Sequence, residues 1–292
     1  MGVVQHAQQL AAYNTDRYPS PAIWSSFPNQ EHNNRRGYYY ELWDDFQNCP
    51  SLTAASGAIN RLYMSYIDTS DTIAGLATEK SRGVLRLTSA ATDNNAPVVT
   101  SHDGNCVMLD DNTSPDNQPL WFEARWRKSS ITVNQAAIFM DLTEEARGVD
   151  NGLMVDDTAV MTTTIDGIGF RVKQDANELD FTWQKASQAN QEMANIISTT
   201  NSAAAALAVS TWYKTGFLYG GGDPVLHDAT QRIKVIVNNV TYTTYVTATN
   251  MAASTFPDGE EMQLAFGLKN GEGTSCTFDV DWVRLAQKML ST

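Results

Sequence analysis

Short runs in which apolar and polar residues alternate fill most of the chain after residue 40, and they constrain its fold more than any other feature. Successive side chains of a β-strand point to opposite faces, so this alternation is typical of strands with one buried face. In LWFEARWRK, residues 120–128, it places Phe122, Ala124 and Trp126 on one side. QAAIFMDL, residues 135–142, places Ile138 and Met140 together in the same way. Gly, Asn, Asp and Pro clusters separate the runs, and the pattern predicts antiparallel strands.

The clearest turn lies within RIKVIVNNVTYTTYVT, residues 232–247. Asn238 and Asn239 tolerate the positive φ values that a type I′ turn requires, so this segment predicts a two-residue hairpin. A regular hairpin with this turn has a fixed register, in which the opposed pairs are Val237 with Val240, Val235 with Tyr242, and Ile233 with Thr244.

Two further hairpins are predicted from similar runs. GFRVKQ and LDFTWQK flank residues 175–178, which gives a hairpin with a four-residue loop. EMQLAFGLK and TFDVDWVRLA are joined through residues 270–273, which predicts a last hairpin that closes the chain. The segment NSAAAALAVSTWY, residues 201–213, combines helix-favouring alanines with a strand-like end, so we expect a loop or short helix that enters a strand.

Size and composition indicate one large β-domain over residues 41–292. The chain has 292 residues, of which 42% are hydrophobic and 18% charged, a composition that excludes disordered, coiled-coil and collagen-like chains. About a dozen strands, without long helices to cover a parallel sheet, predict two packed antiparallel sheets.

Residues 1–40 differ from this domain, because they show no sustained helix or strand period. They contain Pro19, Pro21 and Pro28 and several aromatic residues, which are poor residues for a solvated tail. We therefore expect an extended N-terminal arm that lies either against its own domain or against a neighbouring chain. The sequence leaves both arrangements open.

Charge and segment lengths exclude several partners. With 20 Lys and Arg against 33 Asp and Glu the net charge is −13, so we expect binding neither to nucleic acid nor to anionic lipid. No apolar run reaches membrane-spanning length, and the N-terminus lacks the pattern of an export signal. Cys49, Cys106 and Cys276 are widely spaced, which predicts reduced structural thiols in a protein made in the cytoplasm.

Two local features that often mark catalytic or phosphate sites have ordinary explanations here. The four histidines lie in irregular segments without a GxSxG, HExxH or Cys–His context, so we interpret them as surface residues. YGGGDP, residues 219–224, lacks the spacing of a phosphate-binding loop and predicts a simple loop.

The closing run FDVDWVRLA, residues 278–286, resembles the last strand of concanavalin A-like jelly rolls, the superfamily of legume lectins, laminin G modules and many β-glucanases. The order LWFEARWRKSSI, AIFMDLTEEA, GFRV, a Trp-Tyr strand and RIKVIVNNV is similar to lectin-like structural proteins of tailed bacteriophages. The resemblance implies an all-β, antiparallel two-sheet jelly-roll sandwich, and it does not cover the N-terminal arm. This architecture serves sugar binding, hydrolysis and assembly, so activity must be judged from residues.

The glucanase pattern is incomplete. Glucanases of this superfamily place Glu-x-Asp-x-x-Glu or Glu-x-Asp-x-Glu on one strand, and here Glu178 and Asp180 lack the final acid. We therefore expect no enzyme, no catalytic residue and no cofactor, and interpret these two acids as solvated loop charges. Asp279 and Asp281 share a face of the closing strand, where we expect solubilising edge charges or partners of Arg284.

Metal binding has one weak candidate. LDDNTSPDNQ, residues 109–118, clusters oxygen donors that calcium prefers, among them Asp110, Asp111 and Asp116. The spacing matches no EF-hand, and an ordinary turn rich in Asp and Asn is the favoured interpretation.

A glycan site would need exposed aromatic platforms beside polar groups. The candidates for such platforms are Trp121, Trp183 and Trp212. Aromatic residues on alternating strands usually belong to the core, and this alternative stays open.

An aromatic arm on an acidic sandwich without a catalytic set indicates a chain that binds a protein lattice, and the resemblance to phage proteins implies that this chain is a non-enzymatic virion protein. The predicted role is a bacteriophage capsid decoration or cement protein, made in the host cytoplasm, that binds and stabilises the major capsid protein lattice. Self-association of copies is left open. Many copies on one lattice multiply a modest local affinity. The alternative is a glycan-binding module of a phage head or tail fibre. The candidates for capsid contact are Arg17, Arg35, Arg36, Tyr38, Tyr39 and Tyr40.

Overall fold

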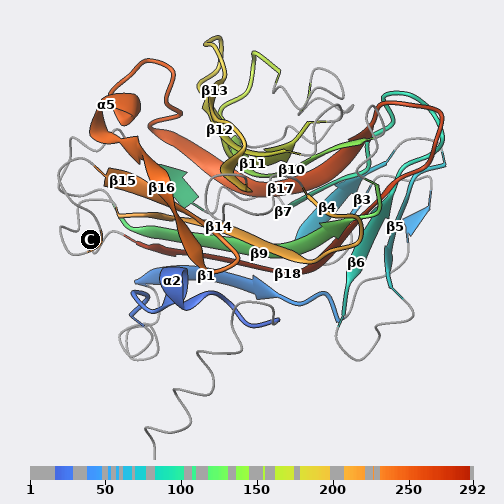
Figure 1. Ribbon diagram of the computed structural model, residues 1–292, viewed down its shortest axis with the longest axis horizontal. Coiled ribbons are helices and arrows are strands. Elements are labelled where there is room, and N and C mark those ends of the chain that lie inside the picture. The colour runs from blue at the N-terminus through green and yellow to red at the C-terminus, as the bar shows by residue number, and fades with distance from the viewer. Residues whose placement is uncertain are drawn as a thin grey trace, which may run out of the picture.

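The computed structural model shows a sandwich of two antiparallel sheets, which confirms the predicted fold class (Figure 1). The structure describes residues 17–28, 38–47, 52–53, 57–58, 62–67, 70–76, 83–101, 107–109, 118–130, 136–144, 154, 162–173, 178–197, 207–220, 226 and 231–289. No helix among them is long and apolar enough to cross a membrane.

Each sheet contains nine strands in the part of the chain that the structure describes. Sheet A has the order β16 (Val240–Thr247), β15 (Gln231–Val237), β14 (Tyr213–Tyr219), β9 (Leu120–Lys128), β18 (Thr277–Lys288), β6 (Leu85–Thr88), β5 (Thr72–Gly75) and β2 (Leu52–Thr53), and β1 (Tyr39–Asp44) also pairs with β18. Sheet B has the order β13 (Gln191–Met193), β12 (Leu179–Gln184), β11 (Gly167–Val172), β10 (Ala136–Glu144), β17 (Glu260–Asn270), β7 (Val98–Ser101), β4 (Tyr63–Tyr66) and β3 (Gly57–Ala58), and β8 (Val107–Leu109) also pairs with β17.

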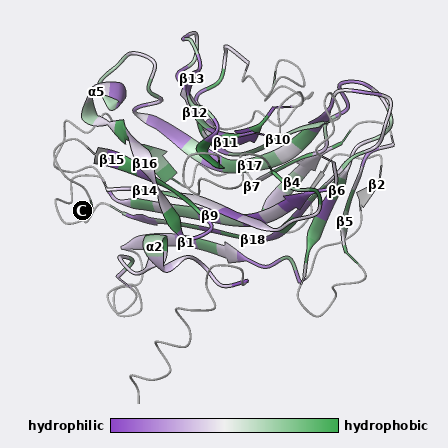
Figure 2. Ribbon diagram, viewed as in Figure 1, coloured by the Kyte–Doolittle hydropathy of each residue, from purple (hydrophilic) through white to green (hydrophobic). Residues whose placement is uncertain are grey.

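The main core lies between the sheets, where the alternation of the sequence places it. Phe122 and Trp126 of β9 and Ile138 and Met140 of β10 are buried there, as predicted. Apolar and polar segments alternate along the strands of both sheets (Figure 2). Among the described residues the helical parts are short: α2 (Pro21–Trp24), α5 (Ala248–Met251) and the two helical residues Ile196 and Ile197, which belong to the main core.

The hairpin at Asn238 and Asn239 is confirmed, and its register needs a correction. Both asparagines have positive φ, 49° and 66°, as a type I′ turn requires. Val237 opposes Val240 as predicted, but a bulge then shifts the pairing. Ile233 therefore opposes Val246 instead of Thr244. In the irregular stretch β16 has two more residues than β15, a number that preserves the alternation of faces, and Val235 and Val246 both lie in the core.

Of the other two predicted hairpins, one is present and one is wrong. β11 pairs with β12, and Val172 opposes Leu179. β17 and β18 do not pair, because β17 belongs to sheet B and β18 to sheet A. The connection crosses the sandwich instead of turning within a sheet. Asn270 Nδ2 donates to Ala90 O at 3.0 Å, and Ser89 N donates to Cys276 O at 3.0 Å, so both ends of the crossing are fixed on another segment.

Candidate functional site

Residues 17–28, which we call the strap, lie on the outer face of sheet A (Figure 1). The strap contains the single helical turn α2, which begins with Pro21 at a position where its missing N–H costs nothing. Ile23 N and Trp24 N both donate to Ser20 O at 3.0 Å and close the turn. Part of the predicted arm therefore lies on the chain's own domain.

Apolar side chains of the strap form a second, smaller core with the sheet. This cluster contains Ile23, Trp24 and Phe27 from the strap and Tyr39, Trp121, Leu218, Ile236 and Ala286 from sheet A. The Phe27 ring meets the Trp121 ring edge-on at 5.2 Å and the Tyr39 ring at 5.7 Å. Edge-to-face pairs of this kind add to the free energy of burial.

A buried carboxylate anchors the strap at its centre. Glu123 of β9 is fully buried, and its Oε2 accepts hydrogen bonds from Ser20 N at 2.8 Å and from Trp24 Nε1 at 2.9 Å. Burial raises the pKa of Glu123, whereas these two hydrogen bonds and the charge of Lys214 oppose the rise. The strap thus supplies the donors that this carboxylate needs.

Further polar contacts hold both ends of the strap. Ala22 N donates to Asn239 Oδ1 at 3.0 Å, which ties α2 to the turn between β15 and β16. Lys214 Nζ donates to Tyr18 O at 3.2 Å, and Trp121 Nε1 donates to Ser26 Oγ at 3.0 Å. We call the residues of sheet A that contact the strap the strap site. They are Tyr39, Trp121, Glu123, Lys214, Leu218, Ile236, Asn239 and Ala286.

An arginine sandwiched between aromatic rings joins the strap to β1. The Arg284 guanidinium lies 3.8 Å from the centre of the Trp24 ring and 4.5 Å from that of Trp43. It also donates to Glu41 Oε1 at 2.8 Å. On the same face, Trp43 stacks on Trp282 at 6.3 Å with an interplanar angle of 18°. Cation–π contacts of this geometry favour a fixed strap.

Asp279 does not behave as predicted. Its carboxylate is buried and binds Arg86 Nε at 2.6 Å and Arg127 Nε at 2.7 Å, whereas Arg284 pairs with Glu41. The interpretation as an edge charge or a partner of Arg284 is wrong, because β18 lies between β6 and β9 in the middle of sheet A.

Asp281 needs the same correction. It is buried at a bulge of β18 and binds Arg125 Nη1 at 2.6 Å and Arg17 Nε at 2.7 Å. Burial raises the pKa of Asp281, and the two arginines oppose the rise. Arg17 thereby fixes the start of the strap.

The structure places the other predicted capsid-contact residues as follows. Tyr39 is buried beneath the strap, and Tyr40 packs against the main core. Tyr38 is 38% exposed at the start of β1. Arg35 and Arg36 lie outside the described residues. Packing on the chain's own domain, which the sequence left open for this arm, holds for Tyr39 and Tyr40.

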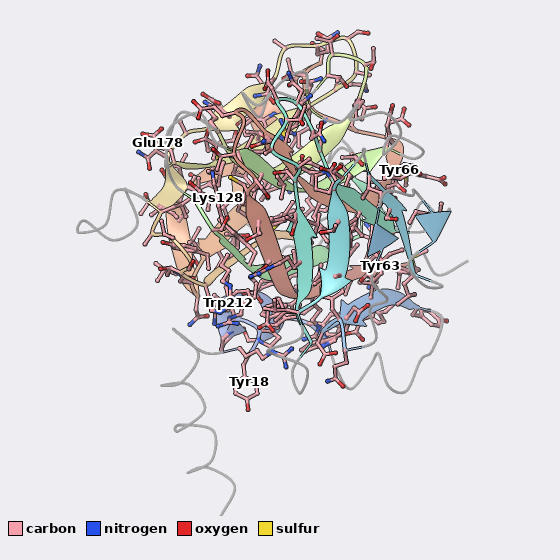
Figure 3. All side chains as sticks on the ribbon, turned by 90° about the vertical axis from the view of Figure 1, so that its right-hand side faces the viewer. Tyr18, Tyr63, Tyr66, Lys128, Glu178 and Trp212 are labelled. Atoms are coloured by element: carbon pink, nitrogen blue, oxygen red, sulfur yellow. The ribbon has the colours of Figure 1, made fainter. Side chains whose placement is uncertain are left out.

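Several large apolar side chains on this side remain exposed. Tyr18 of the strap is 60% exposed and Trp43 of β1 is 47% exposed. Tyr18 projects away from the body (Figure 3). Met289, which follows β18, is also exposed, and its N donates to Tyr38 O at 2.6 Å. We call the outer face of sheet A with the strap and these exposed residues the strap face. Tyr18 is one of the aromatic residues that distinguish the N-terminal arm in the sequence, whereas no sequence pattern marks Trp43.

The three predicted glycan platforms do not form one surface. Trp121 is buried under Phe27, and Trp183 faces the main core. Trp212 is partly exposed and lies between two guanidinium groups, 4.4 Å from Arg125 and 4.3 Å from Arg127.

The outer face of sheet B carries a different, buried polar cluster. Arg171 Nη2 lies 3.0 Å from Asp141 Oδ2, and both side chains are almost fully buried. Burial raises the pKa of Asp141 to about 6, against the opposing effect of Arg171. Arg171 Nη1 also donates to Asn190 Oδ1 at 3.3 Å.

Three oxygens beside this pair are buried and have no hydrogen-bond partner in the described structure: Asp141 Oδ1, Thr143 Oγ1 and Thr182 Oγ1. Gly169 of β11 opposes Asp141 on one side and Thr182 on the other. A Cβ at Gly169 would lie 2.4 Å from Asp141 Oδ1, so only glycine fits there. Buried oxygens without partners are uncommon and favour a polar ligand or ordered water.

Glu178 and Asp180 are not solvated charges as predicted. Asp180 is fully buried, where its Oδ1 accepts from Asn195 N at 2.7 Å and its Oδ2 lies 3.2 Å from Lys173 Nζ. Glu178 Oε1 accepts from Asn195 Nδ2 at 2.9 Å. The segment that carries Asn195 returns to cover β12, which the local sequence did not reveal. The next outward residue of β12 is Thr182, so the glucanase acid is absent from this strand.

An apolar cluster of described residues also lies on this face. Phe139, Val98 and Ala265 pack with Met154 and Ile165 from the segment that follows β10. Lys269 Nζ donates to Met154 O at 3.0 Å, a contact that ties Met154 to β17.

The metal and thiol predictions are tested only in part. Asp110, Asp111 and Asp116 lie outside the described residues, as do Cys49 and Cys106. Within the described ranges no three His, Cys, Asp or Glu side chains gather as metal ligands would. Cys276 is buried, and burial raises the pKa of its thiol against the opposing charge of Lys128. Lys128 is also buried, and burial lowers its pKa to about 8.

Neither family models nor curated proteins match this chain. Solved structures do. A protein of unknown function from Shewanella oneidensis MR-1 aligns with a TM-score of 0.50 and 15% identity over 99% of this chain and 95% of its own. Peanut lectin aligns with a TM-score of 0.50 and 11% identity over 87% of this chain and 99% of its own. SCLam, an endo-β-1,3(4)-glucanase of family GH16, has a TM-score of 0.49 and 10% identity over 86% and 92%. The chain has the concanavalin A-like jelly-roll fold, and these likenesses extend to the fold alone.

Proposed function

We propose that this chain is a non-enzymatic structural protein of a bacteriophage virion, a decoration protein that binds the major capsid protein lattice through its strap face. It is made in the host cytoplasm and joins the capsid surface. The fold serves many functions, so the proposal depends on the two outer faces and on the resemblance of the chain's sequence motifs to lectin-like structural proteins of tailed bacteriophages.

The observation that carries the proposal is the contrast between exposed and buried side chains on the strap face. Tyr18 and Trp43 are exposed, yet each lies next to an arginine that is fixed by an ion pair. Tyr18 follows Arg17, which pairs with Asp281. Trp43 contacts Arg284, which pairs with Glu41. Rigid, exposed aromatic residues beside paired charges resemble the central contacts of protein–protein interfaces. This arrangement supports docking on a protein surface.

The absence of an enzyme mechanism is supported by the acids of sheet B. Asp141 is paired with Arg171, and Asp180 is held by Asn195 and Lys173. Glycoside hydrolysis needs two carboxyl groups that face a bond across open space. Asp141 and Asp180 are buried and face internal partners instead.

We predict that the double variant Tyr18→Ala, Trp43→Ala weakens binding to undecorated capsid shells by about 10- to 100-fold, because it removes two exposed aromatic contacts. Co-sedimentation of the purified chain with shells measures this. Met108→Ala is the matched control, since Met108 is similarly exposed but lies on β8 of sheet B. Equal binding of the double variant and the control contradicts docking through the strap face.

A second candidate function, glycan binding, is favoured by the three unpartnered oxygens on sheet B. If a sugar hydroxyl occupies that site, Thr182→Val removes one of its partners at almost unchanged volume. A glycan array should then show saturable binding by the native chain that falls at least about tenfold in the variant. Thr100→Val, on β7 of the same sheet, is the control. No binding by the native chain eliminates this candidate. Trp183→Ala is a poor probe, because it opens a cavity in the core.

A further inference from the structure

The strap binds its site through groups that every copy of the chain carries. Its hydrogen bonds to Glu123 and Asn239 and its ring contact with Trp121 join it to β9 and to the turn between β15 and β16 of sheet A. The strap of another copy presents the same groups to the same site. Docking within one chain and docking between two chains therefore form equal sets of contacts.

The chain between strap and β1 is longer than docking within one copy requires. The rings of Phe27 and Tyr39 lie only 5.7 Å apart, although twelve peptide steps separate these residues. Twelve steps span up to about 40 Å when extended. A strap with this reach is not restricted to the site on its own domain.

An empty strap site is unfavourable. Without the strap, Glu123 loses the donors Ser20 N and Trp24 Nε1, and the rings of Trp121 and Tyr39 are uncovered. A strap that leaves its own site therefore leaves a vacancy that another strap fills with a gain in free energy. Exchange between copies is reciprocal for this reason.

We propose that neighbouring copies of this chain exchange straps, so that the strap site of one copy receives residues 17–28 of the next. The choice between the two arrangements depends on effective concentration, which rises when copies are held side by side. The inference rests on the proposed function at this point, because the capsid lattice would hold the copies side by side. Exchange would link decoration proteins to each other as well as to the shell.

The test uses full-length chain without any capsid, so its failure is distinguishable from failure of the proposed function. Phe27 is replaced by the photo-crosslinking residue p-benzoylphenylalanine, and isotopically heavy and light chains are mixed, unfolded and refolded together. After irradiation, mass spectrometry identifies crosslinks between the strap and β9. In an equal mixture, half of the crosslinks between copies are heavy–light. Heavy–light pairs should therefore increase with concentration, reach about a quarter of all crosslinks near millimolar chain, where effective concentrations of short linkers lie, and approach about half only above it. If all crosslinks are heavy–heavy or light–light at every concentration, the proposal is overturned.

Two further measurements accompany the crosslinking. The first is a negative control, and the second tests exchange without the photo-residue, so it still applies if the Phe27 variant fails to fold or to crosslink. The same photo-residue at Tyr18, which projects away from the body, should give no crosslinks to β9. Native mass spectrometry of co-refolded wild-type chains should show mixed dimers that disappear in Trp24→Ala, since this variant loses a strap anchor. Absence of mixed dimers in the wild type near millimolar concentration also overturns strap exchange.

Discussion

Replacing Arg171 by methionine is expected to lower the free energy of unfolding by about 3–5 kcal/mol at pH 7, because it leaves the buried Asp141 carboxylate without its charge partner. The two side chains lie 3.0 Å apart and are almost fully buried, so solvent cannot replace the lost interaction. Chemical denaturation monitored by tryptophan fluorescence measures the change.

The double variant Asp141→Leu, Arg171→Met is the control for this prediction. It removes both charges, and we expect it to recover most of the lost stability, since apolar replacements of a buried pair are often neutral or stabilising. A single variant within about 1 kcal/mol of the native chain contradicts a desolvated pair.

The pH dependence of the single variant has a definite sign. In the native chain the pKa of Asp141, raised to about 6, means that the folded state holds this proton more tightly than the unfolded state. The contribution of Asp141 to stability therefore falls as pH rises from about 4 to about 6. Removal of Arg171 raises the folded pKa further, so the penalty of Arg171→Met should shrink when pH is lowered from 7 to 5.

Trp24→Ala is expected to release the strap. The side chain is nearly buried, donates to Glu123 at 2.9 Å and stacks on Arg284, and truncation of such a residue costs about 3–5 kcal/mol of docking free energy. Hydrogen exchange at the Ile23 and Ser25 amides should accelerate by at least about a hundredfold, since 1.4 kcal/mol corresponds to a factor of ten. Limited proteolysis should cleave the strap correspondingly faster.

Tyr18→Ala provides the matched comparison within the strap. Tyr18 is exposed, so its truncation should change the free energy of strap docking by less than about 0.5 kcal/mol. Amide hydrogen exchange in the strap should therefore be almost as slow as in the native chain. Equal protection of the strap in Trp24→Ala and Tyr18→Ala contradicts the anchoring role of Trp24.

Those features of the fold that depend on a local sequence pattern were predicted correctly. Alternation placed Phe122 and Met140 in the core, and the Asn238–Asn239 turn formed as its residues require. The pairing of β17 with β18 was wrong, because the destination of a chain after a loop depends on distant partners. Asn270 and Cys276 are fixed to residues 89–90, about 180 positions away in the sequence.

The residues of the candidate site were harder to predict from the sequence than the fold. The alternation of a strand assigns its outward polar residues to solvent. Glu123 and Asp180 point outward from their sheets and are nevertheless buried, because other segments cover them. Ser20, which covers Glu123, lies 103 positions away in the sequence. One usable signal was present: Arg125 and Arg127 alternate on β9 as Asp279 and Asp281 do on β18, which is the pattern of two complementary neighbouring strands.

Cryo-electron microscopy of the decorated particle tests the central claim most directly, because it shows which face of the sandwich meets the shell. Our account predicts that the strap face, with Tyr18 and Trp43, contacts the major capsid protein and that sheet B points away. Density that places the outer face of sheet B against the capsid, or a purified particle without this chain, contradicts it.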